Sequence, residues 1–108
     1  MIYKVLDKNF AYCIPYTISK INYLLNRKME LFISYDSNFK TYEKIKYNSE
    51  VYYWGFKDLY GRFMSLKIVF YDDHARLYAD KVNNELDINE MMEIIKKIEE
   101  EYFKLLSL

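Results

Sequence analysis

Residues 63–71 read Phe-Met-Ser-Leu-Lys-Ile-Val-Phe-Tyr, and Met64, Leu66, Ile68 and Phe70 fall on alternate positions. Successive side chains of a β-strand point to opposite faces, so this period of two predicts a strand with one face in the core. β-Branched and aromatic residues dominate the middle of the chain, which extends the prediction to a sheet of four or five strands. The candidate strands are Glu30–Tyr35, Lys40–Tyr47, Val51–Lys57, Phe63–Tyr71 and Arg76–Asp80.

Turn-forming residues separate these candidate strands. Asn48-Ser49, Asp58 to Gly61, and Asp72 to His74 stand where antiparallel neighbours would be joined by short loops. Gly61 is able to adopt the left-handed conformation that a bulged turn needs. An antiparallel meander is therefore the expected arrangement of the strands.

Helical spacing flanks the sheet on both sides. Pro15 and Thr17 provide a helix start, and apolar residues share one helical face as far as about Lys28. Asp87–Leu108 is predicted as an amphipathic helix, in which Asp87 and Glu90 resemble an N-capping box. The expected fold class is α+β: an N-terminal helix, an antiparallel meander sheet of 4–5 strands, and a long C-terminal amphipathic helix packed on the sheet. Residues 1–108 are expected to form a single compact domain.

Composition limits the classes of function. With 16 basic and 16 acidic residues the chain has no net charge, which argues against bulk attraction to nucleic acid or to an anionic membrane. The single cysteine, Cys13, excludes an intrachain disulfide. No run approaches the roughly 20 apolar residues of a membrane helix, and the N-terminus lacks the apolar stretch of a signal peptide. We expect a cytoplasmic protein with no membrane partner.

Tyrosine is unusually frequent: 13 Tyr, 7 Phe and 1 Trp make 19% of the 108 residues aromatic. Such side chains supply apolar area with a polar tip, so they suit either a small core or a contact surface. If the aromatics of strand Val51–Lys57 face outward beside neighbouring lysines, the sheet carries a binding face; if they face inward, they are core. The residues of this candidate binding face are Lys40, Tyr42, Lys44, Lys46, Tyr52, Trp54 and Phe56.

The register of one hairpin decides between these outcomes. A three-residue loop, with Tyr47 opposite Val51, places the lysines of Lys40–Tyr47 beside the aromatic row. A two-residue loop places Ile45 and Glu43 there instead, because a one-residue slip reverses the faces of a strand. The first register favours stacking of bases and pairing of phosphates in a single-stranded nucleic acid. The simpler interpretation is that the aromatics are core and the lysines protect an edge strand.

No motif identifies a reaction. Asp72-Asp73-His74 is the one place where carboxylates and an imidazole meet, and we interpret it as a solvated hairpin turn rather than a metal site. Cys13 and His74 are the sole cysteine and histidine, and their context does not suggest a nucleophile with its base. We therefore predict no catalytic residue, no metal and no cofactor.

One enzyme class is compatible with the missing motifs, namely small ribonucleases that act without a histidine pair. The order of helix, strands and helix resembles small bacterial toxin folds in outline, whereas the neutral charge departs from the basic surface that RNA cleavage favours. The residues with suitable chemistry are Lys44, Lys46, Arg62, Arg76 and Tyr78.

The C-terminal helix also suggests a surface for assembly. Met91, Ile95, Ile98 and Tyr102 follow an alternating three and four spacing close to a coiled-coil seam. Packing within the chain is the stronger expectation, because three heptads are short for an independent coiled coil. A homodimer through this helix or through a sheet edge is the alternative.

High aromatic content, zero net charge and the missing catalytic motif together favour a small intracellular module that binds another protein. In size and style the chain resembles inhibitors encoded by phages and other mobile elements, among them anti-CRISPR proteins. That resemblance implies an inhibitor of a host protein or of a protein–nucleic-acid complex. The alternatives are a single-stranded RNA- or DNA-binding protein that uses the lysine and aromatic face, and a ribonuclease toxin-like enzyme.

Overall fold

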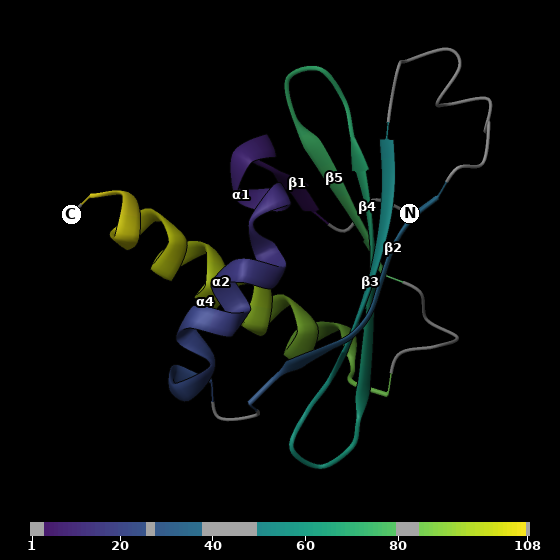
Figure 1. The fold of residues 1–108 in the computed structure, drawn as a ribbon, viewed down its shortest axis with the longest axis vertical. Helices are drawn as coiled ribbons and strands as arrows, with labels where there is room; N and C mark the ends of the chain where they lie inside the picture. The colour runs from purple at the N-terminus through teal and green to yellow at the C-terminus, as the bar shows by residue number, and fades with distance from the viewer. Residues whose placement is uncertain (1–3, 26–27, 38–49, 80–84, 108) are drawn as a thin grey trace.

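The computed structural model describes residues 4–25, 28–37, 50–79 and 85–107, with residues 32–37 and 79 described by their backbone alone. Along these residues the chain forms strands, α-helices and one 3₁₀ turn, η1 (Figure 1). The strands are β1 (Lys4–Leu6), β2 (Glu30–Ser37), β3 (Glu50–Lys57), β4 (Phe63–Phe70) and β5 (Ala75–Ala79). The helical elements are α1 (Lys8–Tyr12), α2 (Ile14–Ile21), η1 (Asn22–Leu24) and α4 (Ile88–Leu106).

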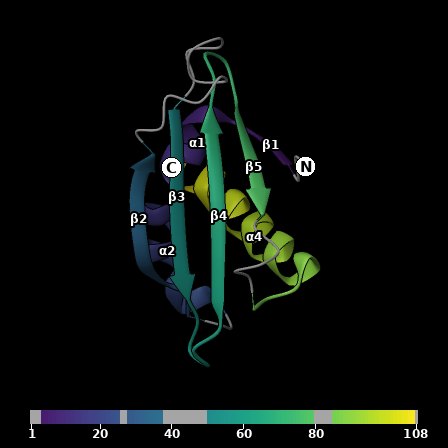
Figure 2. The ribbon, with the colours of Figure 1, turned by 90° about the vertical axis from the view of Figure 1, so that its right-hand side faces the viewer.

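The strands form one five-stranded antiparallel sheet in the order β1-β5-β4-β3-β2. From β2 to β5, neighbours in the sheet follow one another among the described strands, as in the predicted meander, and β1 joins beside β5. The described helices lie together on one side of the sheet, as two perpendicular views show (Figures 1 and 2). The α+β class, with a C-terminal helix packed on an antiparallel sheet, is confirmed.

The strand partner predicted for Val51–Lys57 is wrong. On one side β3 pairs with β4, and on the other it pairs with β2, where Ser37 stands opposite Val51. Because both edges of β3 are occupied in this way, neither of the two predicted hairpin registers occurs. The candidate strand Lys40–Tyr47 itself lies outside the described residues.

The N-terminal helical region is divided rather than continuous. Asp7 caps α1 by accepting a hydrogen bond from the Phe10 N–H at 2.9 Å, and this helix is too short to show a period in the sequence. Pro15 stands in the first turn of α2, where its missing N–H costs no hydrogen bond. The helix ends at Ile21 and η1 follows, instead of continuing to about Lys28.

The core lies between the sheet and the helices. Met64, Leu66 and Ile68, on the face of β4 that alternation predicts to be buried, are fully buried. The start of α4 is also as predicted, because the Asp87 carboxylate accepts a hydrogen bond from the Glu90 N–H at 2.9 Å. From α4 the buried residues are Met91, Ile94, Ile95 and Ile98.

The turn between β3 and β4 is held by one buried carboxylate. Gly61 has φ of 79°, the left-handed conformation predicted for it. Asp58 Oδ1 accepts hydrogen bonds from the N–H groups of Tyr60 at 3.0 Å and Arg62 at 2.8 Å. Its Oδ2 accepts a third bond, from Arg62 Nε at 2.9 Å, and Arg62 Nη1 lies 3.4 Å from Glu90 Oε2. The turn is thereby tied to the first turn of α4.

Candidate binding surface

We call the sheet face toward the helices the inner face and the opposite one the outer face. The aromatic residues predicted for a binding face lie on the inner face: Trp54 is 5% exposed, and Phe56 is 0% exposed. Tyr52 is partly buried against the same core, with its ring centroid 5.4 Å from that of Phe70. This part of the aromatic crowding is therefore core. The remaining candidates, Lys40, Tyr42, Lys44 and Lys46, lie outside the described residues.

The residues predicted for a partner helix are used inside the chain. Tyr102 packs at the edge of the core, with its ring centroid 5.4 Å from that of Phe10. Burial raises the pKa of the Tyr102 phenol, and the nearby Cys13 and Asp7 add to the rise. The other three, each at most 1% exposed, are Met91, Ile95 and Ile98. The seam predicted from their spacing thus faces the core of its own chain.

A different set of aromatic and basic side chains lies on the outer face, onto which Figure 2 looks with the helices behind the strands. Tyr53 on β3 stands opposite Lys67 on β4, and Lys67 stands opposite Tyr78 on β5. Lys67 Nζ lies 5.3 Å from the centroid of the Tyr78 ring, a distance typical of a cation–π contact. All three side chains are half-buried. We call Tyr53, Lys67 and Tyr78 the tyrosine–lysine row.

A small apolar cluster supports this row. Val51, Val69 and Tyr71 are 3%, 0% and 9% exposed, and Tyr53 and Tyr78 pack against them. None of the helices in the described ranges lies over this face (Figure 2). Tyrosine and lysine cover apolar neighbours with their rings and stems while their polar tips reach solvent. The outer face is thus a packed surface with polar tips rather than an exposed hydrophobic patch.

The turn between β4 and β5 continues the outer face. The Arg76 guanidinium carbon lies 4.6 Å from the Tyr71 ring centroid, and the Tyr71 and His74 rings stack at 4.9 Å. Arg76 Nε donates to His74 Nε2 at 3.1 Å, while His74 Nδ1 lies 2.6 Å from Asp73 Oδ1. Hydrogen bonding and charge attraction from His74 lower the pKa of the Asp73 carboxyl. Stacking and hydrogen bonds therefore hold this turn in shape.

Charged side chains occupy both sides of the molecule. Lys57, Lys67 and Arg76 occupy outward positions of β3, β4 and β5, and the backbone of Glu30 stands opposite that of Lys57 in the register. On the helix side, α4 carries five glutamates and three lysines. The strands thus place three basic side chains on the outer face, the adjoining β4–β5 turn adds the acidic Asp72 and Asp73, and α4 carries a surplus of two negative charges.

Among the described residues considered for ribonuclease chemistry, Arg62 lies apart from Arg76 and Tyr78, which share one face of β5. Arg62 is bound to Asp58 at the start of β4, whereas Arg76 pairs in register with Val69 near the other end of that strand. Tyr78 contacts Lys67, and Lys44 and Lys46 are outside the described residues. Within the ranges that the structure describes, no three His, Cys, Asp or Glu side chains come close enough to hold a metal ion.

The residues of the outer face could not be predicted from the sequence, for a physical reason. Its row is built from three strands, and strand alternation alone does not say which of two faces meets the helices. On β3 the inner row Tyr52, Trp54 and Phe56 is only slightly more apolar than Val51 and Tyr53. The usable signal is Lys67 at a position that alternates with buried Met64, Leu66 and Ile68, because a lysine rarely points into a core.

None of the helices in the described part of the chain is both long and apolar enough to span a membrane. Compared with protein-family models, with curated proteins and with solved structures, the chain matches none significantly.

Proposed function

We propose that the chain is a binding module that uses the outer face of its sheet to contact an acidic surface of another protein. The observation that carries this proposal is the tyrosine–lysine row, continued by Arg76 and Tyr71, on a face that no described helix covers. Tyrosine and arginine are enriched among the residues that carry binding energy in protein interfaces. Covering such a surface on a larger protein is one way in which a small chain acts as an inhibitor.

The packing beneath the row favours binding. Tyr53 and Tyr78 lie against buried Val51 and Val69, so their rings are held before a partner arrives. Side chains ordered in advance lose less conformational freedom on association. The positive charges of Lys57, Lys67 and Arg76 on the strands add a preference for carboxylates on the partner and a faster encounter at low salt.

Photo-crosslinking tests this proposal in the organism that encodes the chain. A benzophenone amino acid at position 78 should capture one defined protein, and the same amino acid at position 60 should not. Tyr60 is a suitable control because it is 73% exposed, also lies beside an arginine, and stands in the β3–β4 turn instead of the outer face. Equal capture from both positions, or none from position 78, would refute the proposal.

A charge reversal sharpens the same test. Lys67→Glu should abolish capture from position 78, because a glutamate there would face the acidic surface of the partner. Lys20→Glu is the matched control, since Lys20 Nζ lies 5.4 Å over the Tyr16 ring on α2, a similar pair away from the outer face. Both variants should stay folded by circular dichroism, because neither lysine belongs to the buried core.

Single-stranded nucleic acid is the second candidate, favoured by one observation. Lys67 lies over Tyr78 and Arg76 over Tyr71, which places cations beside rings on the same face, as in surfaces that stack bases and pair phosphates. Trp54 is 5% exposed on the inner face, so its fluorescence is a poor probe and a labelled oligonucleotide should be followed by anisotropy.

If this candidate is right, affinity for the oligonucleotide should fall roughly 20-fold between about 50 and 200 mM salt, as release of counterions from three phosphate contacts requires. At a fixed salt concentration, Lys67→Glu should bind the oligonucleotide more weakly than wild type, while Lys20→Glu should bind it about as well as wild type. Binding that is insensitive to salt, or equally affected by both variants, would exclude this use of the outer face.

A further inference from the structure

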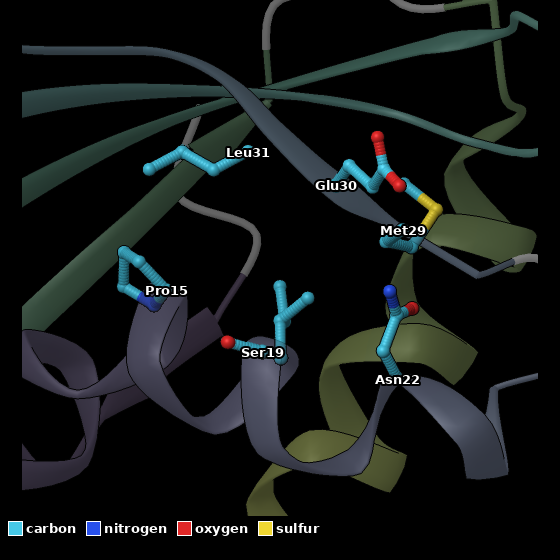
Figure 3. A pocket seen from close by; sticks show the side chains of 7 residues that line it. Pro15, Ser19, Asn22, Met29, Glu30 and Leu31 are labelled. Carbon is cyan, nitrogen blue, oxygen red and sulfur yellow. The ribbon is translucent and has the colours of Figure 1, made fainter.

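A cleft opens on the helix side of the molecule, between α2 with η1 and the start of β2. Its volume is about 420 Å³, within the range of ligand-binding pockets. Figure 3 shows Pro15, Ser19 and Asn22 lining one wall and Met29 and Leu31 the other. The cleft lies on the side of the sheet opposite to the outer face, so it is separate from the tyrosine–lysine row.

The spacing of residues on α2 explains why the cleft exists. Ile14, Ile18 and Ile21 face the core and are buried. Pro15 and Ser19, four residues apart, share the neighbouring side of the helix, which faces β2. Their small side chains leave space there. The opposite wall is apolar and open, because Leu31 is 46% exposed while Met29 beside it is 1% exposed.

The neighbouring strand supplies the rest of a binding site. β2 is eight residues long and stands last in the sheet order, so its second edge has no partner among the described strands. A strand edge presents main-chain N–H and C=O groups in a row, and extended peptides bind such edges by adding a strand. Glu30 contributes the sole charged side chain of the lining, and its negative charge complements a basic residue on the peptide.

We propose that this cleft binds an extended, basic segment of a partner protein, which adds to β2 as a further strand. An apolar side chain of the segment enters between Ile18, Met29 and Leu31, and a lysine or arginine next to it lies near Glu30. Main-chain N–H and C=O groups of the segment pair with those of the β2 edge. The site is distinct from the outer face and does not depend on the function proposed for that face.

The proposal is tested by selecting peptides from a random dodecapeptide phage library on the intact protein. Enriched peptides should alternate apolar and basic residues without an internal proline. Their affinity for Leu31→Lys should be about tenfold or more below wild type, because a lysine there puts charge in an apolar cleft and repels a basic peptide. Leu59→Lys is the matched control, since Leu59 is 62% exposed in the β3–β4 turn.

Failure to enrich any peptide, or equal binding by the two lysine variants, would overturn the proposal. A concentration-dependent dimer in sedimentation that Leu31→Lys abolishes would also overturn it, because the occupant of the β2 edge would then be a second copy of the chain.

Discussion

Replacing Phe56 by alanine is expected to lower the free energy of unfolding by roughly 3–5 kcal/mol, the usual cost of removing a fully buried phenylalanine. The side chain is 0% exposed in the main core, on the inner face of β3 opposite Met64. The cost has two parts, the lost transfer of the ring out of water and the cavity that remains. For a domain of this size such a loss is a large fraction of the total stability.

Urea denaturation followed by far-UV circular dichroism measures this effect. Tyr60→Ala is the control, since that aromatic ring is 73% exposed in a turn and its removal should change stability little. The comparison also separates the two interpretations of the aromatic strand. If Phe56 belonged to a binding face, its replacement would weaken partner binding and leave stability nearly unchanged.

The C-terminal helix and β4 could be predicted because local pattern and tertiary packing agree for them. In α4 the apolar residues at helical spacing are the ones that are buried. Asp87 stands directly before this pattern in the sequence, and it caps the helix as that position predicts. In β4 the alternation of Met64, Leu66 and Ile68 matches the buried face. When each level of the structure favours the same outcome, one sequence suffices to find it.

The N-terminal region and the strand pairing could not be predicted in the same way. α1 has five residues, fewer than two turns, so no periodicity could reveal it. Pairing of β2 with β3 joins strands that are separated by residues 38–49, and proximity in sequence favoured Lys40–Tyr47 as the partner. Which strand pairs with β3 is decided by the whole sheet rather than by any local pattern.

Prediction of the tyrosine–lysine row likewise depended on knowing which strands pair and in which register. Tyr53, Lys67 and Tyr78 come from three strands, and only the observed registers place them in one row. A shift of one residue in either register would exchange the faces of a strand. The frequency of tyrosine indicated that aromatic rings would matter, but assigning individual rings to core or surface required knowing which face α4 covers.

Replacing Asp58 by alanine is expected to lower the free energy of unfolding by roughly 2–3 kcal/mol, because it removes three hydrogen bonds, one of them to a cation. The Asp58 side chain is 0% exposed, while its partner Arg62 keeps 33% exposure and is partly solvated when left alone. Arg62 would also lose its anchor beside Glu90, loosening the link between the β3–β4 turn and α4. Asp72→Ala, in an exposed turn, is the control and should leave stability nearly unchanged.

The pH dependence of stability distinguishes the charge of Asp58 from its shape. Burial alone would raise the pKa of this carboxyl, but hydrogen bonds from the Arg62 backbone and side chain and from the Tyr60 backbone outweigh it, so the folded pKa lies below 3.8. A lowered pKa means that the folded state holds the proton less tightly than the unfolded state. The stabilisation is therefore complete above the unfolded pKa and is lost as pH falls through the folded one.

Asp58→Asn tests this directly, because asparagine keeps a side-chain oxygen that can accept from the turn N–H groups while losing the negative charge. The difference in free energy of unfolding between wild type and Asp58→Asn should be constant near neutral pH and should shrink as pH falls below about 4. A difference that stays constant down to pH about 2 would show that the charge contributes nothing. The hydrogen bonds of the turn would then account for the whole effect of Asp58→Ala.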